Sequence, residues 1–227
     1  MTIIRTLAVA ALFTLWIADS NAQTVPTAVL RQDICVTEGS LTYLPDGQIQ
    51  IDAPSVRAVA NASDGRTAEI QFRYLGPSDE TRPLASGELR RQIGLKLHTL
   101  DTCNLVYAMW HIEPNANIVV LIKHNPTEHT NNECHAGGYT TIQPSASLPM
   151  PDIAIGEWHI FRATLAGATL TVTADGVDAW QGVLPASIGD FDGPSGFRTD
   201  NARFVFAFLA GAAPPRPDFR CPRGSGD

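Results

Sequence analysis

The chain has 227 residues, with 16 Lys and Arg against 23 Asp and Glu, which gives a formal net charge of −7 at pH 7. A surface that binds nucleic acid needs an excess of positive charge, so this balance argues against a nucleic-acid partner. It also offers no support for long-range attraction of anionic polymers.

The first 22 residues have the pattern of a secretory signal peptide. Arg5 supplies positive charge, an apolar run follows over residues 7–17, and Ser20-Asn21-Ala22 places small residues at a cleavage position. The run is shorter than the ~20 residues that a membrane-spanning helix needs, and no other segment is long and apolar enough. We therefore expect a secreted or periplasmic protein without a membrane span.

Apolar and polar residues alternate along much of the remaining chain, with turn residues between the runs, and this pattern predicts strands. The runs at 104–112 and 117–124 are apolar on both faces, which is typical of central strands. The expected strands are 48–52, 68–75, 92–99, 104–112, 117–124, 159–165, 169–174, 177–181, 196–199 and 203–208. The expected loops are 76–87, 125–138 and 144–156, with a single helical turn at 185–190.

No linker or internal repeat divides the mature chain, so we expect one all-β domain over residues 23–212. The tail, residues 213–227, is rich in Pro, Arg and Gly. We expect it to be ordered only as far as a disulfide at Cys221.

Four cysteines, an even number in an exported chain, indicate disulfides. Three pairings are possible, and we favour Cys35–Cys221 and Cys103–Cys134. The first would join the two ends of the mature chain, and the second would hold the long loop 125–138 against a preceding strand. A cysteine metal site is disfavoured because no Cys-x-x-Cys spacing occurs. No cofactor is expected.

Three segments in the last third of the chain carry a family resemblance. They are Gly156-Glu157-Trp158-His159, the hairpin at 169–178, and the run from Gly193 to Asn201. Together they resemble the concanavalin A-like lectin/glucanase superfamily, especially its laminin-G-like members. The resemblance implies a jelly roll of two antiparallel sheets. Because these motifs occur in lectins, hydrolases, lyases and adhesion modules, they imply a fold and not an activity.

Candidate catalytic groups are sparse. A glycoside hydrolase needs two carboxylates across the scissile bond, yet no Glu-x-Asp occurs, and Glu69 is interpreted as a salt-bridge partner. Glu88-Leu89-Arg90-Arg91 and Gln92-Ile93-Gly94 are similar to two strands of jelly-roll alginate lyases. The histidine of the second strand is replaced by Gly94, and the terminal Tyr/Lys strand of those lyases is absent.

Polar and aromatic side chains on neighbouring predicted strands suggest a binding face instead. If successive strands pair in sequence order, alternate residues share one concave face. Aromatic rings stack on sugars while fixed polar groups read hydroxyls. The candidate ligand-binding residues are Gln71, Arg73, Lys96, His98, Tyr107, His111, Lys123 and, from the loop 125–138, His129.

The loop 125–138 is dense in His and Glu, but its irregular spacing favours a disulfide-held loop over a metal site. Asp200-Asn201 is interpreted as a tight turn rather than a calcium site. The leading hypothesis is binding of an extracellular glycan or another small ligand on the concave face. The alternatives are a polysaccharide-degrading enzyme, for instance with His98 or His111 beside Tyr107, and an adhesion module with a flat face.

Overall fold

The computed structural model describes residues 25–216 and Cys221. The predicted signal peptide (1–22) and the tail segments 217–220 and 222–227 lie outside the described residues. No helix within the described part is long and apolar enough to cross a membrane.

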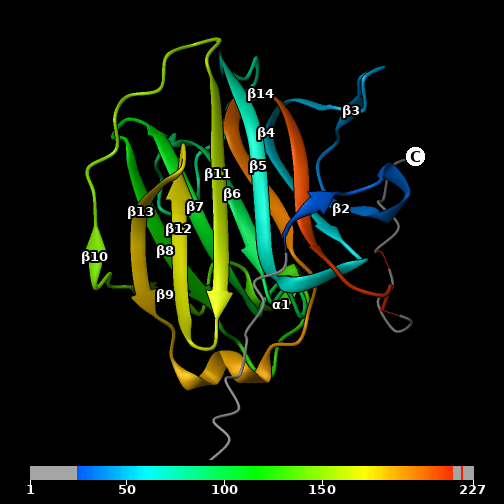
Figure 1. Ribbon diagram of the computed structural model, residues 1–227, viewed down its shortest axis with the longest axis vertical. Helices are drawn as coiled ribbons and strands as arrows, with labels where there is room; N and C mark the ends of the chain where they lie inside the picture. Colours follow the sequence, from blue (N-terminus) through cyan, green and yellow to red (C-terminus); the bar gives the residue numbers. More distant parts are fainter. Residues whose placement is uncertain (1–24, 217–220, 222–227) are drawn as a thin grey trace, which may run out of the picture.

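The described chain is built from antiparallel strands that form one continuous, curled sheet (Figure 1). The strand order along its main path is β10-β13-β12-β11-β5-β14-β6-β7-β8-β9. The strands are β1 (Thr27–Ala28), β2 (Ile34–Glu38), β3 (Thr42–Tyr43), β4 (Ile49–Ala60), β5 (Ser63–Pro77), β6 (Arg91–Leu97), β7 (Leu105–Glu113), β8 (Asn117–Lys123), β9 (Tyr139–Ile142), β10 (Ala146–Ser147), β11 (Trp158–Ala166), β12 (Thr169–Ala174), β13 (Val177–Val183) and β14 (Gly196–Ala212). The helical segments are η1 (Arg31–Asp33), α1 (Asn131–Cys134) and η2 (Ala186–Asp190).

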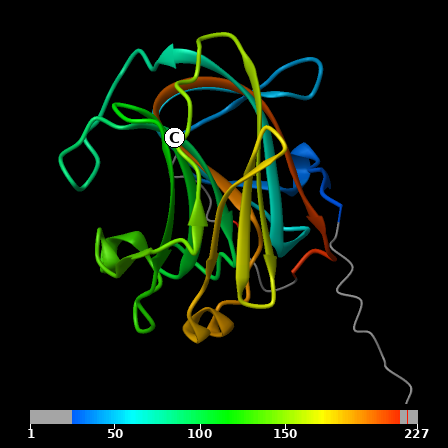
Figure 2. The same ribbon diagram turned by 60° about the vertical axis from the view of Figure 1, so that its left-hand side comes forward.

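The curl places two arms of the sheet over one another (Figures 1 and 2). We call β6, β7, β8 and β9 arm A, and β5, β11, β12, β13 and β10 arm B. Residues of both arms belong to one hydrophobic core. Trp110 of β7, for example, has its ring 5.6 Å from Phe72 of β5 and 5.5 Å from Phe161 of β11. The all-β prediction is confirmed, while a division into two separate jelly-roll sheets stays a prediction.

Strand β14 joins the two arms. Its first residues pair with β6, from Gly196 opposite Lys96 to Asp200 opposite Gln92. Beyond Asn201 it pairs instead with β5, while β4 pairs with its other side from Gly196 to Phe206. The prediction of two strands with a turn at Asp200-Asn201 was therefore wrong. Asn201 has a φ of +54°, which asparagine tolerates, and the strand bends there instead of turning back.

Alternation along arm A separates the core from a polar face. On β6, Ile93, Leu95 and Leu97 belong to the core. Gln92 and Lys96, which alternate with them, project to the opposite face, as Tyr107 does on β7. The prediction that 104–112 and 117–124 are central strands is confirmed, because β7 and β8 each pair on both sides.

Both expected disulfides are present. Cys35 is bonded to Cys221 with a Cα–Cα distance of 5.5 Å, and Cys103 to Cys134 with 5.9 Å. The segment 125–138, predicted as loop, contains one helical turn, α1. Its capping box joins the Thr130 side chain to the backbone of Glu133 and the Glu133 side chain to the backbone of Thr130.

Candidate functional site

A pocket of about 670 Å³ lies on the polar face of arm A, opposite the core. Strands β4, β6, β7, β8 and β14 form its floor. Residues 82–86 form one wall, and Asn131, His135 and Ala136 belong to another. The loop 125–138 therefore contributes part of the pocket wall.

The pocket is strongly basic, although the chain is acidic overall. Two carboxylates line it, Glu38 and Asp200, against six basic side chains. The basic residues are Arg57, Arg82, Arg90, Lys96, Lys123 and Arg198. The sequence contains two lysines in all, and both line this pocket. The net charge of the whole chain gave no support for long-range attraction of anionic polymers, but the charge of the pocket itself is positive.

Asp200 organises the floor. It is 1% exposed, and its Oδ2 accepts hydrogen bonds from Arg198 Nε and from Gln92 Nε2, each at 2.7 Å. Arg57 Nη2 lies 3.4 Å from Asp200 Oδ1. The nearby carboxylate of Asp200 raises the pKa of Arg198 against the opposing effect of its burial. Gln92 also lines the pocket, and its Oε1 is buried without a hydrogen-bond partner among the described residues.

Lys96 is the unusual cation of the pocket. Its residue is 2% exposed, and its ammonium has no hydrogen-bond or ion-pair partner among the residues that the structure describes. Burial and the positive charges of Arg57 and Arg198 together lower the pKa of Lys96 to about 7, against the opposing effect of Glu38. A lysine in this state gains or loses its proton near neutral pH.

Two tyrosines give the pocket an aromatic surface. The rings of Tyr107 and Tyr139 are stacked, with centroids 6.2 Å apart and an interplanar angle of 27°. The guanidinium carbon of Arg198 lies 5.3 Å from the centroid of the Tyr107 ring. This distance is within the range of a cation–π contact, so Arg198 is held between Asp200 and Tyr107.

His111 and Arg90 lie together beside the pocket. Arg90 Nη1 is 3.3 Å from His111 Nε2. Burial, together with the positive charge of Arg90, lowers the pKa of His111 to about 4. At neutral pH the imidazole is therefore uncharged and accepts a hydrogen bond from the guanidinium.

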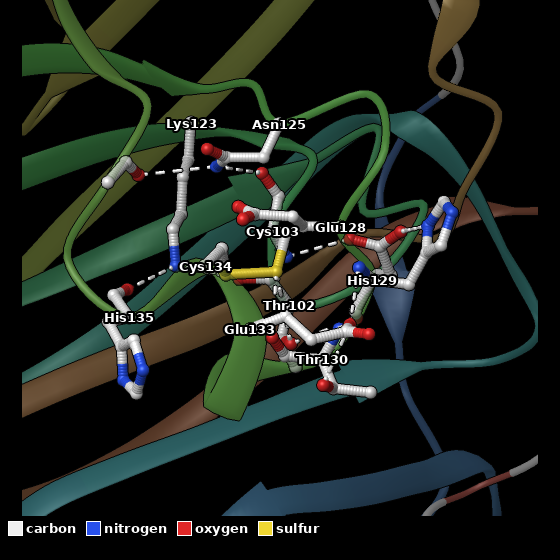
Figure 3. Close-up of a disulfide and its surroundings, with 12 residues drawn as sticks. Thr102, Cys103, Lys123, Asn125, Glu128, His129, Thr130, Glu133, Cys134 and His135 are labelled. Atoms are coloured by element: carbon white, nitrogen blue, oxygen red, sulfur yellow. Dashed lines mark hydrogen bonds and ion pairs between the residues drawn. A yellow bond between two sulfur atoms is a disulfide. The ribbon is translucent and has the colours of Figure 1, made fainter.

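Lys123 holds the wall formed by α1 (Figure 3). Its ammonium donates to the carbonyl oxygens of His135 at 2.8 Å and Thr102 at 3.2 Å, and lies 3.0 Å from Cys134 Sγ. Asn125 Nδ2 joins the same region by donating to the carbonyl of Cys103 at 3.1 Å. Lys123 lines the pocket as predicted, but its donors are used within the protein.

The other predicted ligand residues lie elsewhere. Gln71 and Arg73 project from β5 on the outer face of arm B, where Gln71 donates to Glu69 and Arg73 lies 5.4 Å from the ring centroid of Trp158. The expected common face was wrong for these two, because β5 pairs with β11 and β14 rather than with β6.

The structure also separates two predicted histidines from the pocket. His98 Nδ1 lies 2.6 Å from the carbonyl oxygen of Phe191, and neither residue lines the pocket. His129 Nδ1 lies 2.7 Å from Asp101 Oδ2 on an exposed loop. Of the eight predicted residues, Lys96, Tyr107 and Lys123 line the pocket, and His111 adjoins it through Arg90.

Arg198, Asp200, Arg57 and Tyr139 line the pocket but were missed. Arg198 and Asp200 belong to a segment that was interpreted as a strand end and a turn, so their common face was not considered. Arg57 lies in the part of β4 beyond the predicted strand 48–52, and Tyr139 begins β9, a strand that was not predicted. Gln92 was noticed through its similarity to a lyase strand, but its position in a pocket was not.

The structure also shows the surroundings of two positions that the sequence analysis considered for catalysis, Glu69 and Gly94. Glu69, 2% exposed, is bonded to Arg162 and Gln71 on arm B, as the salt-bridge interpretation predicted. At Gly94 an added Cβ would lie 2.3 Å from Met109 Sδ and 2.7 Å from the Ala108 carbonyl oxygen, so a histidine does not fit there. Within the described residues, no three His, Cys, Asp or Glu side chains are grouped to hold a metal ion.

Comparisons with known proteins show the fold. No family model matches the chain, and no curated protein matches it. Among solved structures, the carbohydrate-binding module CBM66 from Bacillus subtilis is 14% identical, with a TM-score of 0.52 over 81% of this chain and 96% of that one. The GH43 protein BlXynB from Bacillus licheniformis is 13% identical, with a TM-score of 0.52 over 89% of this chain and 41% of that one. At these identities the likeness is one of β-sandwich architecture alone.

Proposed function

We propose that this protein is an exported β-sandwich that binds an extracellular carbohydrate in the basic pocket of arm A. The proposal includes the finer fold prediction of a two-sheet jelly roll of the concanavalin A-like type, and a secreted or periplasmic location. The two disulfides support that location, because such bonds persist in oxidising compartments.

The observation that carries the proposal is the combination of aromatic surface and fixed polar groups in one pocket. Tyr107 and Tyr139 offer ring surface, and Arg198, Gln92 and Lys96 offer polar groups on a hydrogen-bonded floor. The volume, about 670 Å³, falls within the ~300–1,000 Å³ of small-ligand sites and suits one to a few sugar units. A sugar needs both kinds of contact, because its ring faces are apolar and its hydroxyls are not.

A polysaccharide lyase is the second candidate, favoured by one observation. Lys96 of β6 is directly opposite Tyr107 of β7 in the strand register, and the pKa of Lys96 is lowered to about 7. A neutral lysine can take the proton beside a uronate carboxylate, and a tyrosine hydroxyl can protonate the leaving oxygen. An increase in ultraviolet absorbance from an unsaturated uronate product would distinguish this activity from binding. The adhesion-module alternative predicted a flat face, and the pocket counts against it.

Affinity electrophoresis of the mature protein through gels containing neutral or acidic polysaccharides tests the proposal. We expect retention of the wild type by at least one polysaccharide and a loss of retention in Tyr107→Ala. Trp158→Ala is the matched control, because Trp158 is 49% exposed on arm B, away from the pocket. If retention persists in Tyr107→Ala and is lost in Trp158→Ala, the site lies on arm B and the proposal is overturned. The proposal is also overturned if no polysaccharide retains the wild type.

A further inference from the structure

We propose that the carbohydrate bound in this pocket is acidic, and that Lys96 binds its carboxylate or sulfate group. This inference rests on the proposed function and adds the chemical class of the ligand. It depends on three features of the site: an unpaired buried ammonium, carboxylates that are already engaged, and an excess of fixed positive charge.

The first feature is the isolation of the Lys96 ammonium. It projects from β6 into the pocket, with 2% of the residue exposed. Lys123, the other lysine, has three contacts to protein atoms, whereas Lys96 Nζ has none among the described residues. A mostly buried ammonium without a protein partner is costly, because it keeps little of its hydration and gains no compensating hydrogen bond. A ligand anion would supply the missing counter-charge.

The second feature is that neither pocket carboxylate is free to neutralise Lys96. Asp200 accepts from Arg198 and Gln92 and lies near Arg57. Glu38 Oε2 lies 2.6 Å from Arg57 Nη1, and Glu38 Oε1 accepts from the Ser55 hydroxyl at 2.8 Å. The two acidic groups are thus bonded to the arginines, and the pocket keeps an uncompensated positive charge around Lys96.

The third feature is the direction in which the surrounding charges act. Arg57 and Arg198 both repel the Lys96 ammonium, and their repulsion adds to the effect of burial on its pKa. An anion placed between these three cations is attracted to each of them, and hydrogen bonds between charged groups are about twice as strong as neutral ones. Neutral sugars gain none of this energy, so the site discriminates in favour of acidic units.

The chemistry of the pocket favours a sugar acid over a bare anion or a nucleic acid. The stacked Tyr107 and Tyr139 rings provide a surface for a pyranose ring near the cations. The net charge of −7 for the whole chain opposes long polyphosphate chains, which need an extended basic surface. Uronic acids and sulfated sugars combine a ring with one localised negative charge.

Binding of such a ligand is expected to depend on pH through Lys96. The groups around its ammonium are Arg57 and Glu38 on β4 and β2, Arg198 and Asp200 on β14, and Tyr107 on β7. The anion binds the protonated form and raises the pKa of Lys96, so affinity is full below pH 7. It falls as the pH rises above 7, because a proton must then be taken up on binding. His111 does not contribute at these pH values, since its pKa is about 4.

The test is isothermal titration calorimetry of the mature protein at pH 6.5 with matched pairs of polysaccharides. Fully methyl-esterified polygalacturonate carries a neutral methyl ester in place of each carboxylate of polygalacturonate. Dextran lacks the sulfate groups of dextran sulfate. Lys96→Met removes the ammonium and leaves an unbranched apolar side chain one atom shorter. Arg73→Met removes a cation from arm B and serves as the control. Circular dichroism of each variant verifies folding.

We expect the wild type to bind at least one charged polysaccharide tenfold or more tightly than its neutral counterpart. Lys96→Met should lose that preference, and Arg73→Met should keep it. A preference within the polygalacturonate pair identifies the bound group as a carboxylate, and a preference within the dextran pair identifies it as a sulfate. For the wild type we further expect affinity to fall about tenfold or more between pH 6 and pH 9, and this dependence should vanish in Lys96→Met.

Four outcomes would overturn the inference. If the charged and neutral polysaccharides of each pair bind with equal affinity, and Tyr107→Ala weakens this binding, the protein binds carbohydrate without a preference for acidic sugars. A charge preference that survives Lys96→Met would place the anion elsewhere. Binding of single-stranded DNA as tight as that of the acidic polysaccharides would show a general anion site. Binding of none of the probes would contradict both this inference and the proposed function.

Discussion

Arg198 and Asp200 lie two positions apart on β14 and are bonded to each other on the pocket floor, with Arg198 Nε 2.7 Å from Asp200 Oδ2. Both belong to the first part of β14, before its bend at Asn201. Asp200 also binds Gln92 from β6 and lies near Arg57 from β4. One buried carboxylate therefore connects three strands and fixes the orientation of the arginine that contacts Tyr107.

Asp200→Asn is expected to destabilise the protein. The substitution leaves the buried guanidinium of Arg198 without its charged partner, and breaking a buried pair in this way costs about 3–5 kcal/mol. Urea denaturation followed by circular dichroism measures the change. Asp178→Asn is the matched control, because Asp178 is exposed on β13, and it should change the free energy of unfolding by less than about 0.5 kcal/mol. Equal stability of the two variants would contradict the assigned role of Asp200.

Lys96→Met is expected to stabilise the free protein at neutral pH, by roughly 1–3 kcal/mol, because it replaces a mostly buried, unpaired cation with an apolar side chain. The effect should depend on pH in a defined direction. The pKa of Lys96 is lowered to about 7 in the folded protein, whereas unfolded lysine titrates near 10.4. The destabilising effect is therefore complete below pH 7 and disappears as the pH rises toward 10.4.

Denaturant unfolding of the wild type and Lys96→Met at pH 6, 8 and 10 measures this difference. We expect the gain in the variant to shrink steadily over that range. A variant less stable than the wild type at pH 6 would show that Lys96 has a stabilising partner in the free protein.

The Cys103–Cys134 disulfide is expected to matter for binding as well as for stability. It closes a loop with a sequence separation of 31, for which chain-entropy arguments give roughly 3–4 kcal/mol. The disulfide holds Cys134, the last residue of α1 (Figure 3). Its removal in a Cys103→Ser/Cys134→Ser variant should also weaken ligand binding, because Asn131 of α1 and the following His135 line a wall of the pocket.

The matched control for this variant is Cys35→Ser/Cys221→Ser, which removes the disulfide that ties β2 to the chain end. Neither of these cysteines lines the pocket. We expect the control to lose stability and to keep its affinity for the ligand, as measured by calorimetry under conditions where both variants are folded. Equal losses of affinity in the two variants would argue against a specific role for the α1 wall.

The two lysines allow a direct measurement of titration. Reductive ¹³C-methylation labels Lys96 and Lys123, and NMR follows each across pH. We expect Lys96 to titrate near pH 7 in the free protein and at higher pH with an acidic oligosaccharide bound. A Lys96 pKa near 10 in the free protein, with no response to the ligand, would contradict the electrostatic account of the pocket.

The sequence predicted the strands and the disulfides better than the residues of the pocket, because the pocket depends on which strands are neighbours in space. Lys96 and Tyr107 were correctly placed on one face, because β6 and β7 are consecutive strands that pair with each other. Gln71 and Arg73 were misplaced, because the spatial neighbours of β5 are β11 and β14, which follow much later in the chain. Alternation determines which side chains share a strand face, but strand order across the sheet is a non-local property.

The same limit explains the missed floor of the pocket. Asp200-Asn201 has the composition of a turn, and the φ of +54° at Asn201 is typical of one. The tertiary pairing of β14 with β4 along both halves keeps the chain running in the same direction there. Arg198 and Asp200 consequently appeared as turn-flanking residues, although they lie beside Gln92 and Arg57 in the middle of the sheet.

The most direct test of the account is a crystal structure of the protein with an acidic oligosaccharide, such as a short oligogalacturonate. We predict that the sugar lies against Tyr107 and that one carboxylate oxygen lies within about 2.7–2.9 Å of Lys96 Nζ, the length of a charge-assisted hydrogen bond. A ligand bound against Trp158 on arm B, or a sugar in the pocket whose carboxylate is turned to solvent and away from Lys96, would contradict it.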